Sequence, residues 1–296
     1  MKNILEARDI VKNYPGIRAL DYVTLEVYEG ECLGLIGPNG AGKTTFIEIL
    51  EGLREPDSGR ILFRGHAFPA NYKEFIGIQL QKASFPDFLT VRETITLFAN
   101  LYKKSRNPEE MISLFELQEF INRDTRQLSG GQFLRMSLAI ALINDPELIF
   151  LDEPSTGLDP EARRQVWDLI LQLKNEGKTI ILTTHFMEEA EKLCDRIGFL
   201  DRGRLIDLST PAELCRKYNA GKYIELKAEE QPLVEAINLE YLLKNDKLLI
   251  PVQNIKEVLP SLIDCDIDLE NLKIYDETLD DIYVKLVNSP QVYKAH

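Results

Sequence analysis

The feature that most constrains this 296-residue chain is the stretch GPNGAGKTT, from Gly37 to Thr45. It lies between residues 32–36, an apolar run typical of a buried strand, and residues 46–50, which continue a helical pattern. The stretch matches G-x-x-x-x-G-K-[ST] in the strand–loop–helix setting that a phosphate-binding loop requires. Glycines let a backbone approach an anion closely, and the next helix points its first amides at it. The residues expected to bind phosphates are Gly37, Asn39, Gly40, Ala41, Gly42, Lys43, Thr44 and Thr45.

A second stretch, residues 146–153, is an apolar run that ends in Asp152 and Glu153. Ligands of open α/β sheets bind beyond the carboxyl ends of the strands. Alone, two such carboxylates more often mark a solvated strand edge than a site. Beside a phosphate loop, we expect Asp152 and the Thr44 hydroxyl to bind Mg²⁺. Glu153 is then placed to orient and deprotonate an attacking water.

Composition limits the partners and the compartment. The net charge of −13 argues against broad nucleic-acid binding, which needs a basic surface. The cysteines are too scattered for a disulfide framework or a zinc site, so we expect reduced thiols in a cytosolic protein. No apolar run approaches 18 residues and the N-terminus lacks a signal peptide, so any membrane role is expected to act through a partner. The four cysteines are Cys32, Cys194, Cys215 and Cys265.

The pattern of apolar runs predicts an α/β fold. Strand-like and helical segments alternate over the first ~215 residues, which favours a parallel core sheet. The first ~30 residues alternate in polarity and predict an antiparallel β edge, and a helical insertion is expected at about 86–130. We therefore expect a cassette over residues 1–218, and a small α+β domain over residues 222–290 that runs strand, helix, strand, helix, strand, helix.

Residues 128–132, LSGGQ, precede a further helical pattern and identify the type of nucleotide hydrolase. This stretch resembles the signature of the ATP-binding-cassette (ABC) family, and the chain is similar to an ABC transporter ATPase subunit over about residues 1–215. A nucleotide kinase that shares only the phosphate loop does not explain this stretch. The resemblance implies a P-loop NTPase fold, with ATP and Mg²⁺ as cofactors.

The resemblance also implies roles for residues outside the phosphate loop. Tyr14 matches the aromatic residue that stacks on adenine, and Asp159 matches the D-loop that begins at Ser155. Gln81 matches the glutamine that contacts Mg²⁺ and faces the membrane partner, although Gln79 is a neighbouring alternative. His185, at the end of TIILTTH, matches the switch histidine near the terminal phosphate.

In the resembled family the signature binds the ATP held by a second cassette. A helix start at residue 129 suits a second anion site. The resemblance then implies two cassettes that close head to tail over two nucleotides, so that the dimer depends on ATP. Because this chain carries every motif, a homodimer is favoured over a heterodimer. The residues that would contact the opposite nucleotide are Ser129, Gly130, Gly131 and Gln132.

The leading hypothesis is an ATPase subunit on the cytoplasmic face that powers an integral membrane transporter subunit. A tail at residues 279–283 fits the branch that exports drugs, antibiotics, peptides or polysaccharides only loosely, so an importer cassette stays open. A soluble ABC protein acting on ribosomes or nucleic acid is the alternative from another class. The membrane partner is expected to dock at residues 85–105. Four aromatic residues could line that groove or be core of the insertion: Phe85, Phe88, Phe98 and Tyr102.

Overall fold

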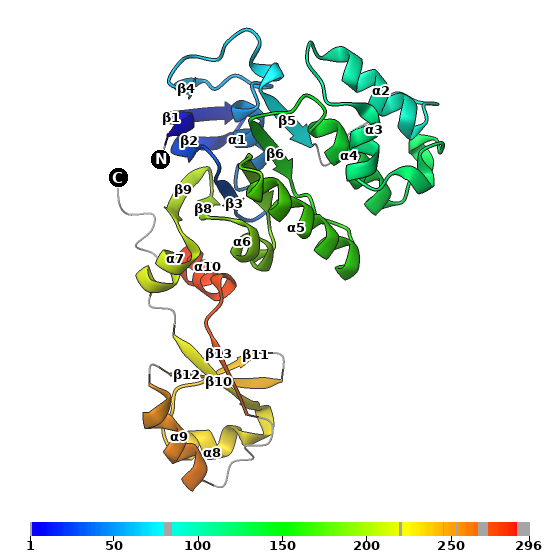
Figure 1. Cartoon of the computed structure of the whole chain (residues 1–296). Helices are drawn as coiled ribbons and strands as arrows, with labels where there is room; N and C mark the ends of the chain where they lie inside the picture. Colours follow the sequence, from blue (N-terminus) through cyan, green and yellow to red (C-terminus); the bar gives the residue numbers. More distant parts are fainter. Residues whose placement is uncertain are drawn as a thin grey trace. The chain divides into compact units, whose positions relative to one another are not determined.

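The computed structural model of the chain describes residues 2–79, 85–218, 221–244, 246–252, 254–265 and 272–288. The backbone divides into two compact units, residues 1–210 and 211–296 (Figure 1). None of the helices within the described ranges has the length and apolar character needed to cross a lipid bilayer.

A six-stranded sheet with the order β5-β6-β7-β3-β8-β9 forms the centre of the first unit. Neighbouring strands pair in parallel, except that β9 runs antiparallel to β8. The parallel α/β core predicted from the continuous apolar runs is confirmed. The strands are β3 (Cys32–Ile36), β5 (Ile76–Gln79), β6 (Leu148–Asp152), β7 (Thr179–Thr184), β8 (Arg196–Asp201) and β9 (Arg204–Ser209).

The expected antiparallel strands form a sheet of their own, with the order β2-β1-β4. Its strands are β1 (Asn3–Tyr14), β2 (Ile17–Tyr28) and β4 (Ser58–Phe63). Helix α1 (Lys43–Leu50) contributes to the core that the two sheets share, in which Val23, Leu35, Phe46 and Phe150 are at most 1% exposed. This shared core fixes the phosphate loop, because the loop joins β3 to α1.

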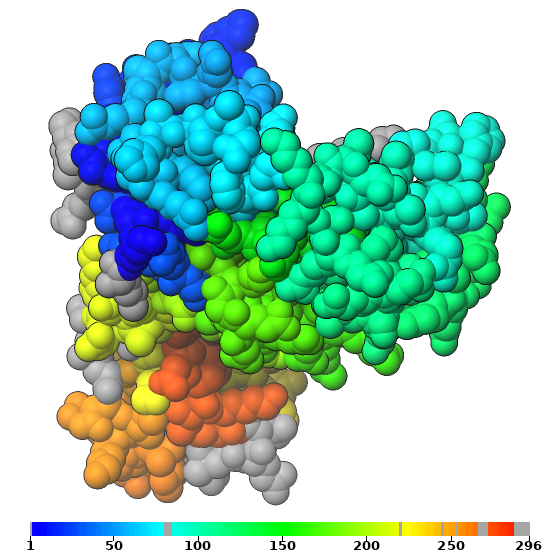
Figure 2. All heavy atoms as spheres, turned by 45° about the horizontal axis from the view of Figure 1, so that its top comes forward, coloured from blue at the N-terminus to red at the C-terminus, as the bar shows by residue number. Residues whose placement is uncertain are grey.

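The helical part of the first unit contains α2 (Val91–Leu101), α3 (Pro108–Leu114) and α4 (Gly130–Ala141). Figure 1 shows these helices grouped beside β5, and in Figure 2 they form a lobe at one side of the unit. The spacing of Thr90 and Glu93 in the sequence predicts a capping box, and these two residues form it reciprocally at the start of α2. The remaining helices of this unit are α5 (Pro160–Asn175) and α6 (Met187–Leu193), which pack against each other.

The second unit is a small α+β structure with a four-stranded antiparallel sheet in the order β11-β12-β10-β13. Its division from the first unit falls before α7, earlier than the expected linker at 219–221, since α7 packs against α10. The sequence of residues 232–241 predicts a helix, but the helix ends at Ala236, and the chain later forms the short strand β11. The elements are α7 (Pro211–Lys217), β10 (Lys222–Lys227), α8 (Gln231–Ala236), β11 (Leu242–Lys244), β12 (Lys247–Val252), α9 (Ile255–Asp264), β13 (Lys273–Asp276) and α10 (Leu279–Asn288).

Candidate nucleotide-binding and hydrolysis site

The phosphate loop leaves no room for side chains at two of its glycines. A Cβ atom on Gly37 would lie 2.1 Å from the Leu200 carbonyl oxygen, and one on Gly42 would lie 2.5 Å from the Ala19 carbonyl oxygen. Gly42 also has φ +105°, a conformation that residues with a Cβ rarely adopt. As the N-cap of α1 it offers no side-chain cap, and the first turn holds no acidic residue. The first amides of α1 are therefore suited to an anion.

Lys43 lies over this loop. Its ammonium donates hydrogen bonds to the Gly37 oxygen at 2.6 Å and the Pro38 oxygen at 3.2 Å. Burial lowers the pKa of Lys43, whereas the nearby charges of Glu153 and Asp152 act to raise it. Lys43, which is 7% exposed, thus places a cation at the loop, a charge that suits phosphate oxygens.

Thr183 fixes both acidic residues at the end of β6. The Thr183 hydroxyl donates to Asp152 Oδ1 at 2.5 Å and accepts from the Glu153 amide at 3.0 Å. Burial raises the pKa of Asp152, since its charged form is desolvated. Glu153 adopts φ 49°, and the Thr156 hydroxyl donates to its Oε2 at 3.1 Å. Thr183 and Thr156 were not among the residues predicted from the sequence; a polar residue within the apolar run of β7 was the available signal.

His185 follows β7 and faces the same acidic group. Its Nδ1 lies 3.5 Å from Glu153 Oε1, and its side chain is 42% exposed. The structure thus brings together Lys43, Asp152, Glu153 and His185. Gln81 lies outside the described residues, while the alternative, Gln79, is buried at the end of β5 beside β6.

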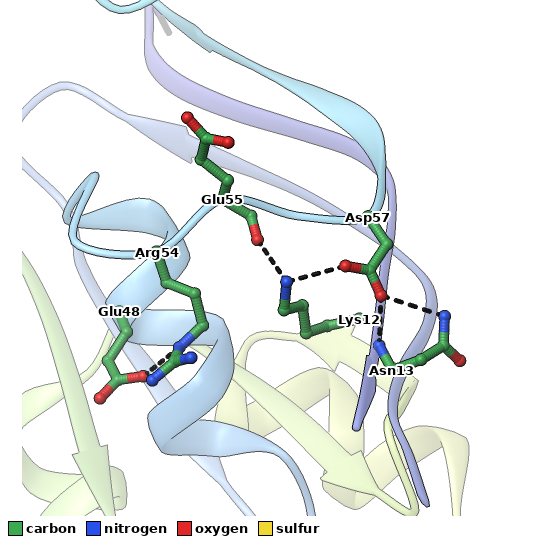
Figure 3. Close-up of polar contacts among 6 residues, drawn as sticks. All are labelled: Lys12, Asn13, Glu48, Arg54, Glu55 and Asp57. Atoms are coloured by element: carbon green, nitrogen blue, oxygen red, sulfur yellow. Dashed lines mark hydrogen bonds and ion pairs between the residues drawn. The ribbon is translucent and has the colours of Figure 1, made fainter. Parts of the chain in front are cut away.

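Tyr14, the expected adenine platform, is half-buried at the end of β1. The guanidinium carbon of Arg54 lies 5.5 Å from the centre of the Tyr14 ring. Arg54 Nε donates to Glu48 Oε2 at 2.6 Å, and Glu48 belongs to α1. Figure 3 shows Arg54 bound to Glu48 on α1. The helix that begins at the phosphate loop therefore also holds a cation against Tyr14, the expected base-stacking residue.

The strand end that carries Tyr14 is tied to the segment before β4. Lys12 Nζ donates to the Glu55 carbonyl oxygen and to Asp57 Oδ1, both at 2.8 Å. The other oxygen of Asp57 accepts from the Asn13 amide at 2.6 Å and from its side chain at 3.1 Å (Figure 3). The three contacts on Asp57 lower its pKa, with the Lys12 hydrogen bond contributing most.

The signature residues form a second helix start, away from the phosphate loop. Ser129 caps α4, with its hydroxyl accepting from the Gln132 amide at 3.3 Å and Gln132 Oε1 accepting from the Ser129 amide at 3.1 Å. A Cβ atom built on Gly130 would meet nothing within 4 Å. Asp159 is the N-cap of α5. It lines a groove of about 640 Å³ together with Ser129, Gly130, Gly131 and Gln132. Among the described residues that line this groove, none belongs to the phosphate loop.

Glu51 is an acidic residue that the sequence analysis did not single out. It is 1% exposed at the end of α1, and no described residue hydrogen-bonds to its Oε2. Burial, with smaller contributions from Asp152 and Glu48, raises the pKa of Glu51 to about 8. It lines a pocket of about 430 Å³ with Tyr72 and Lys103. Its position after an apolar helical run gave no sign that it would be buried.

Comparison with known proteins identifies the class. A family model described as "ABC transporter" matches residues 20–156. The Nod factor export ATP-binding protein I of Rhizobium etli is 39% identical over 241 residues, covering 79% of this chain and 76% of the relative. The daunorubicin resistance ATP-binding protein DrrA3 of Streptomyces coeruleorubidus is 35% identical, with 96% and 95% covered. The dimeric structure of a bacterial ABC transporter cassette matches with a TM-score of 0.64 and 27% identity, over 70% of this chain and 98% of that one.

The fold, the phosphate loop and the acidic strand end define a P-loop ATPase. The chain belongs to the family of ABC transporter ATP-binding subunits, and it is an ATPase of that family. The resemblance that the signature stretch indicated is therefore confirmed.

Proposed function

We propose that this ATPase powers a separate membrane-spanning exporter subunit, through dimers of cassettes that close on ATP. Support for export comes from two relatives, whose names state Nod factor export and daunorubicin resistance. The net charge of −13 disfavours a nucleic-acid partner.

The residues of the loop fit ATP with Mg²⁺. Lys43 and the uncapped amides of α1 hold the phosphates, and Tyr14 stacks on the base. Within the described part of the chain, no three Asp, Glu, His or Cys side chains are grouped so as to hold a metal ion alone. Mg²⁺ commonly takes one or two protein oxygens together with phosphates and waters. The Thr44 hydroxyl and Asp152 supply such oxygens, and a bound cation offsets the desolvation of Asp152; Gln81 is a further proposed ligand.

Glu153 is the proposed general base. It accepts a proton from the water that attacks the terminal phosphate, while the bond between that phosphate and ADP breaks. Thr156 and the left-handed backbone of Glu153 fix its carboxylate, and His185, 3.5 Å away, lies on its other side. Lys43 stabilises the charge that develops on the phosphate oxygens.

One observation carries the dimer proposal: Gly130 has open space around it although nothing in its own chain requires a glycine there. Glycine in a helix interior costs about 1 kcal/mol relative to alanine, so helix stability does not favour glycine. The glycine is accounted for if the α4 start receives a nucleotide held by a second cassette, with Gly131, Gln132 and Asp159 beside it. A homodimer is the simplest assembly because this chain carries both half-sites.

The experiment that tests this function uses Glu153→Gln, which removes the base and retains the shape. Its hydrolysis rate is expected to fall by about 10² to 10⁴, with ATP affinity retained. Light scattering after size exclusion should show a dimer with ATP and Mg²⁺, and a monomer with ADP. Adding Ser129→Arg should abolish this dimer and leave nucleotide binding unchanged, because the change lies outside the chain's own phosphate loop.

Glu110→Gln, the same change at an exposed position of α3, is the matched control and should hydrolyse ATP at the wild-type rate. A Glu153→Gln chain that stays monomeric with ATP, or that pairs equally well without it, contradicts the dimer proposal. Wild-type turnover in this variant contradicts the assignment of the base.

Exposed apolar residues on the helical part support docking of the membrane subunit there. Phe88 is 77% exposed under the Arg126 guanidinium, and Leu101 is 66% exposed. Phe85 and Phe98 instead contact each other, with ring centres 5.7 Å apart, and burial raises the pKa of Tyr102. In this proposal Phe88 and Leu101 form the contact that holds the chain at the cytoplasmic face, and replacing both by serine should release it from membranes.

A further inference from the structure

A short series of ring contacts lies behind His185. The rings of His185 and Phe186 have centres 4.1 Å apart with an angle of 39° between their planes. On the Phe186 ring lies the guanidinium of Arg163, whose central carbon is 4.4 Å from the ring centre. A cation at this distance is attracted to the face of an aromatic ring. Arg163, Phe186 and His185 therefore form one contiguous contact that ends at Glu153.

Arg163 connects this contact to the start of α5. Its amide donates to the Asp159 carbonyl oxygen at 3.0 Å, and the Asp159 carboxylate caps the same turn through two further amides at 2.9 Å. The backbone of Arg163 is thus fixed to that of Asp159. A displacement of Asp159 would move the guanidinium with it.

Hydrogen bonds do not explain why the Arg163 guanidinium lies on the Phe186 ring. Its Nε is buried, and no described residue accepts a hydrogen bond from it. A guanidinium in a folded protein normally satisfies its donors with carboxylates or carbonyls. Elsewhere on the same pair of helices, Trp167 Nε1 donates to the buried Glu189 at 2.9 Å, so α5 and α6 already hold together without Arg163.

We propose that Arg163 and Phe186 are positioning residues for hydrolysis, which hold the His185 ring beside Glu153 and link it to Asp159. The inference rests on the proposed function, in which Glu153 is the base and Asp159 faces a second cassette. Closure of the dimer against Asp159 then sets the position of His185, so each site hydrolyses its nucleotide only when the partner is in place. Misplacing a catalytic group by about 1 Å can cost up to about 10² in rate.

The test compares Arg163→Met with its neighbour Arg164→Met, an exposed arginine of the same helix. In the full-length chain, Arg163→Met is expected to lower kcat about tenfold, while the Kd for ATP changes less than about twofold. Phe186→Leu should act in the same way. Arg163→Lys and Phe186→Tyr should recover most of kcat, because they restore the cation and the ring. Arg164→Met should match the wild type.

A double-mutant cycle separates positioning of His185 from general loosening. In a His185→Ala chain, Arg163→Met should cause no further loss of kcat. Two results overturn the inference. One is a wild-type kcat in both Arg163→Met and Phe186→Leu. The other is a loss of kcat on Arg163→Met that is as large in the His185→Ala chain as in the wild type. If His185→Ala itself turns over at the wild-type rate, the role of His185 in the proposed function fails as well. A slow His185→Ala chain, beside Arg163→Met and Phe186→Leu chains that both turn over at the wild-type rate, removes only this inference.

Discussion

The two glycine-rich helix starts, α1 and α4, present backbone amides in different ways. At α1 the N-cap is the left-handed Gly42, which has no side chain to satisfy those amides. At α4, Ser129 and Gln132 satisfy each other's amides in a capping box. The first start has no side-chain cap, whereas at the second the capping box satisfies the amides of Ser129 and Gln132 and not those of the glycines between them.

The two helix starts also have glycines for different reasons. Gly37 and Gly42 are required by the chain itself, since a Cβ atom at either would overlap a backbone oxygen. Gly130 faces open space and has an ordinary helical backbone. A glycine that its own fold does not require indicates a constraint from outside the chain. This difference is the physical reason for our proposal that α1 binds a nucleotide within one chain and that α4 contacts a nucleotide held by another.

The strongest test of this difference replaces each glycine by alanine. Gly37→Ala should destabilise the fold by about 3 kcal/mol, because the new methyl group overlaps the Leu200 carbonyl. It should also abolish ATP binding, because relief of the overlap displaces the loop. Gly130→Ala should change the free energy of unfolding by no more than about 0.5 kcal/mol and should still impair hydrolysis. Urea unfolding, nucleotide titration and phosphate release measure the three quantities.

Gly40→Ala is the control, because Gly40 has a positive φ but no atom within 4 Å of its Cβ position. Backbone strain alone should cost it about 1–2 kcal/mol. If Gly130→Ala destabilised the apo chain as much as Gly37→Ala, the contrast between the two helix starts would be lost.

Much of this site could be predicted from local sequence. The phosphate loop, the carboxylates that end β6 and the capping box of α2 each depend on residues a few positions apart. Thr183 could not be found in this way, because it reaches Asp152 across two strands 31 positions apart in the chain. The sequence around residue 210 predicts that a helix starts there, but not which unit the helix packs against. Local patterns define elements, and long-range packing decides their partners.

The C-cap residues of the same two helices differ in polarity. The C-cap of α4 is the apolar Leu142, whereas the C-cap of α1 is the buried, ionisable Glu51. The pKa of Glu51 is raised from 4.5 to about 8, so the folded chain keeps this proton while the unfolded chain loses it. Stability should therefore fall as the pH rises from 4.5 to 8, by up to about 1.4 kcal/mol per pH unit.

Glu51→Gln removes this titration and keeps the shape of the side chain. Thermal unfolding at about pH 5.5, 7 and 8.5 should show that the stability of the variant relative to the wild type increases as the pH rises. Glu55→Gln, the same change at an exposed position, should follow the wild-type pH dependence. Parallel curves for the Glu51→Gln variant and the wild type would mean that Glu51 is ionised in the folded chain.

The smallest expected effect is on ATP affinity, through the adenine base rather than the phosphates. Arg54 lies against Tyr14 and is held by Glu48 of α1, so it should support the ring without contacting the phosphate loop. Arg54→Gln is expected to weaken ATP binding about twofold to fivefold, the range of an exposed cation–π contact. Binding of inorganic tripolyphosphate, which lacks a base, should not change. Arg60→Gln, on the exposed side of β4, is the matched control. Equal weakening of both ligands would place Arg54 at the phosphate end of the site. The proposal that Arg54 supports stacking of the base on Tyr14 would then be wrong.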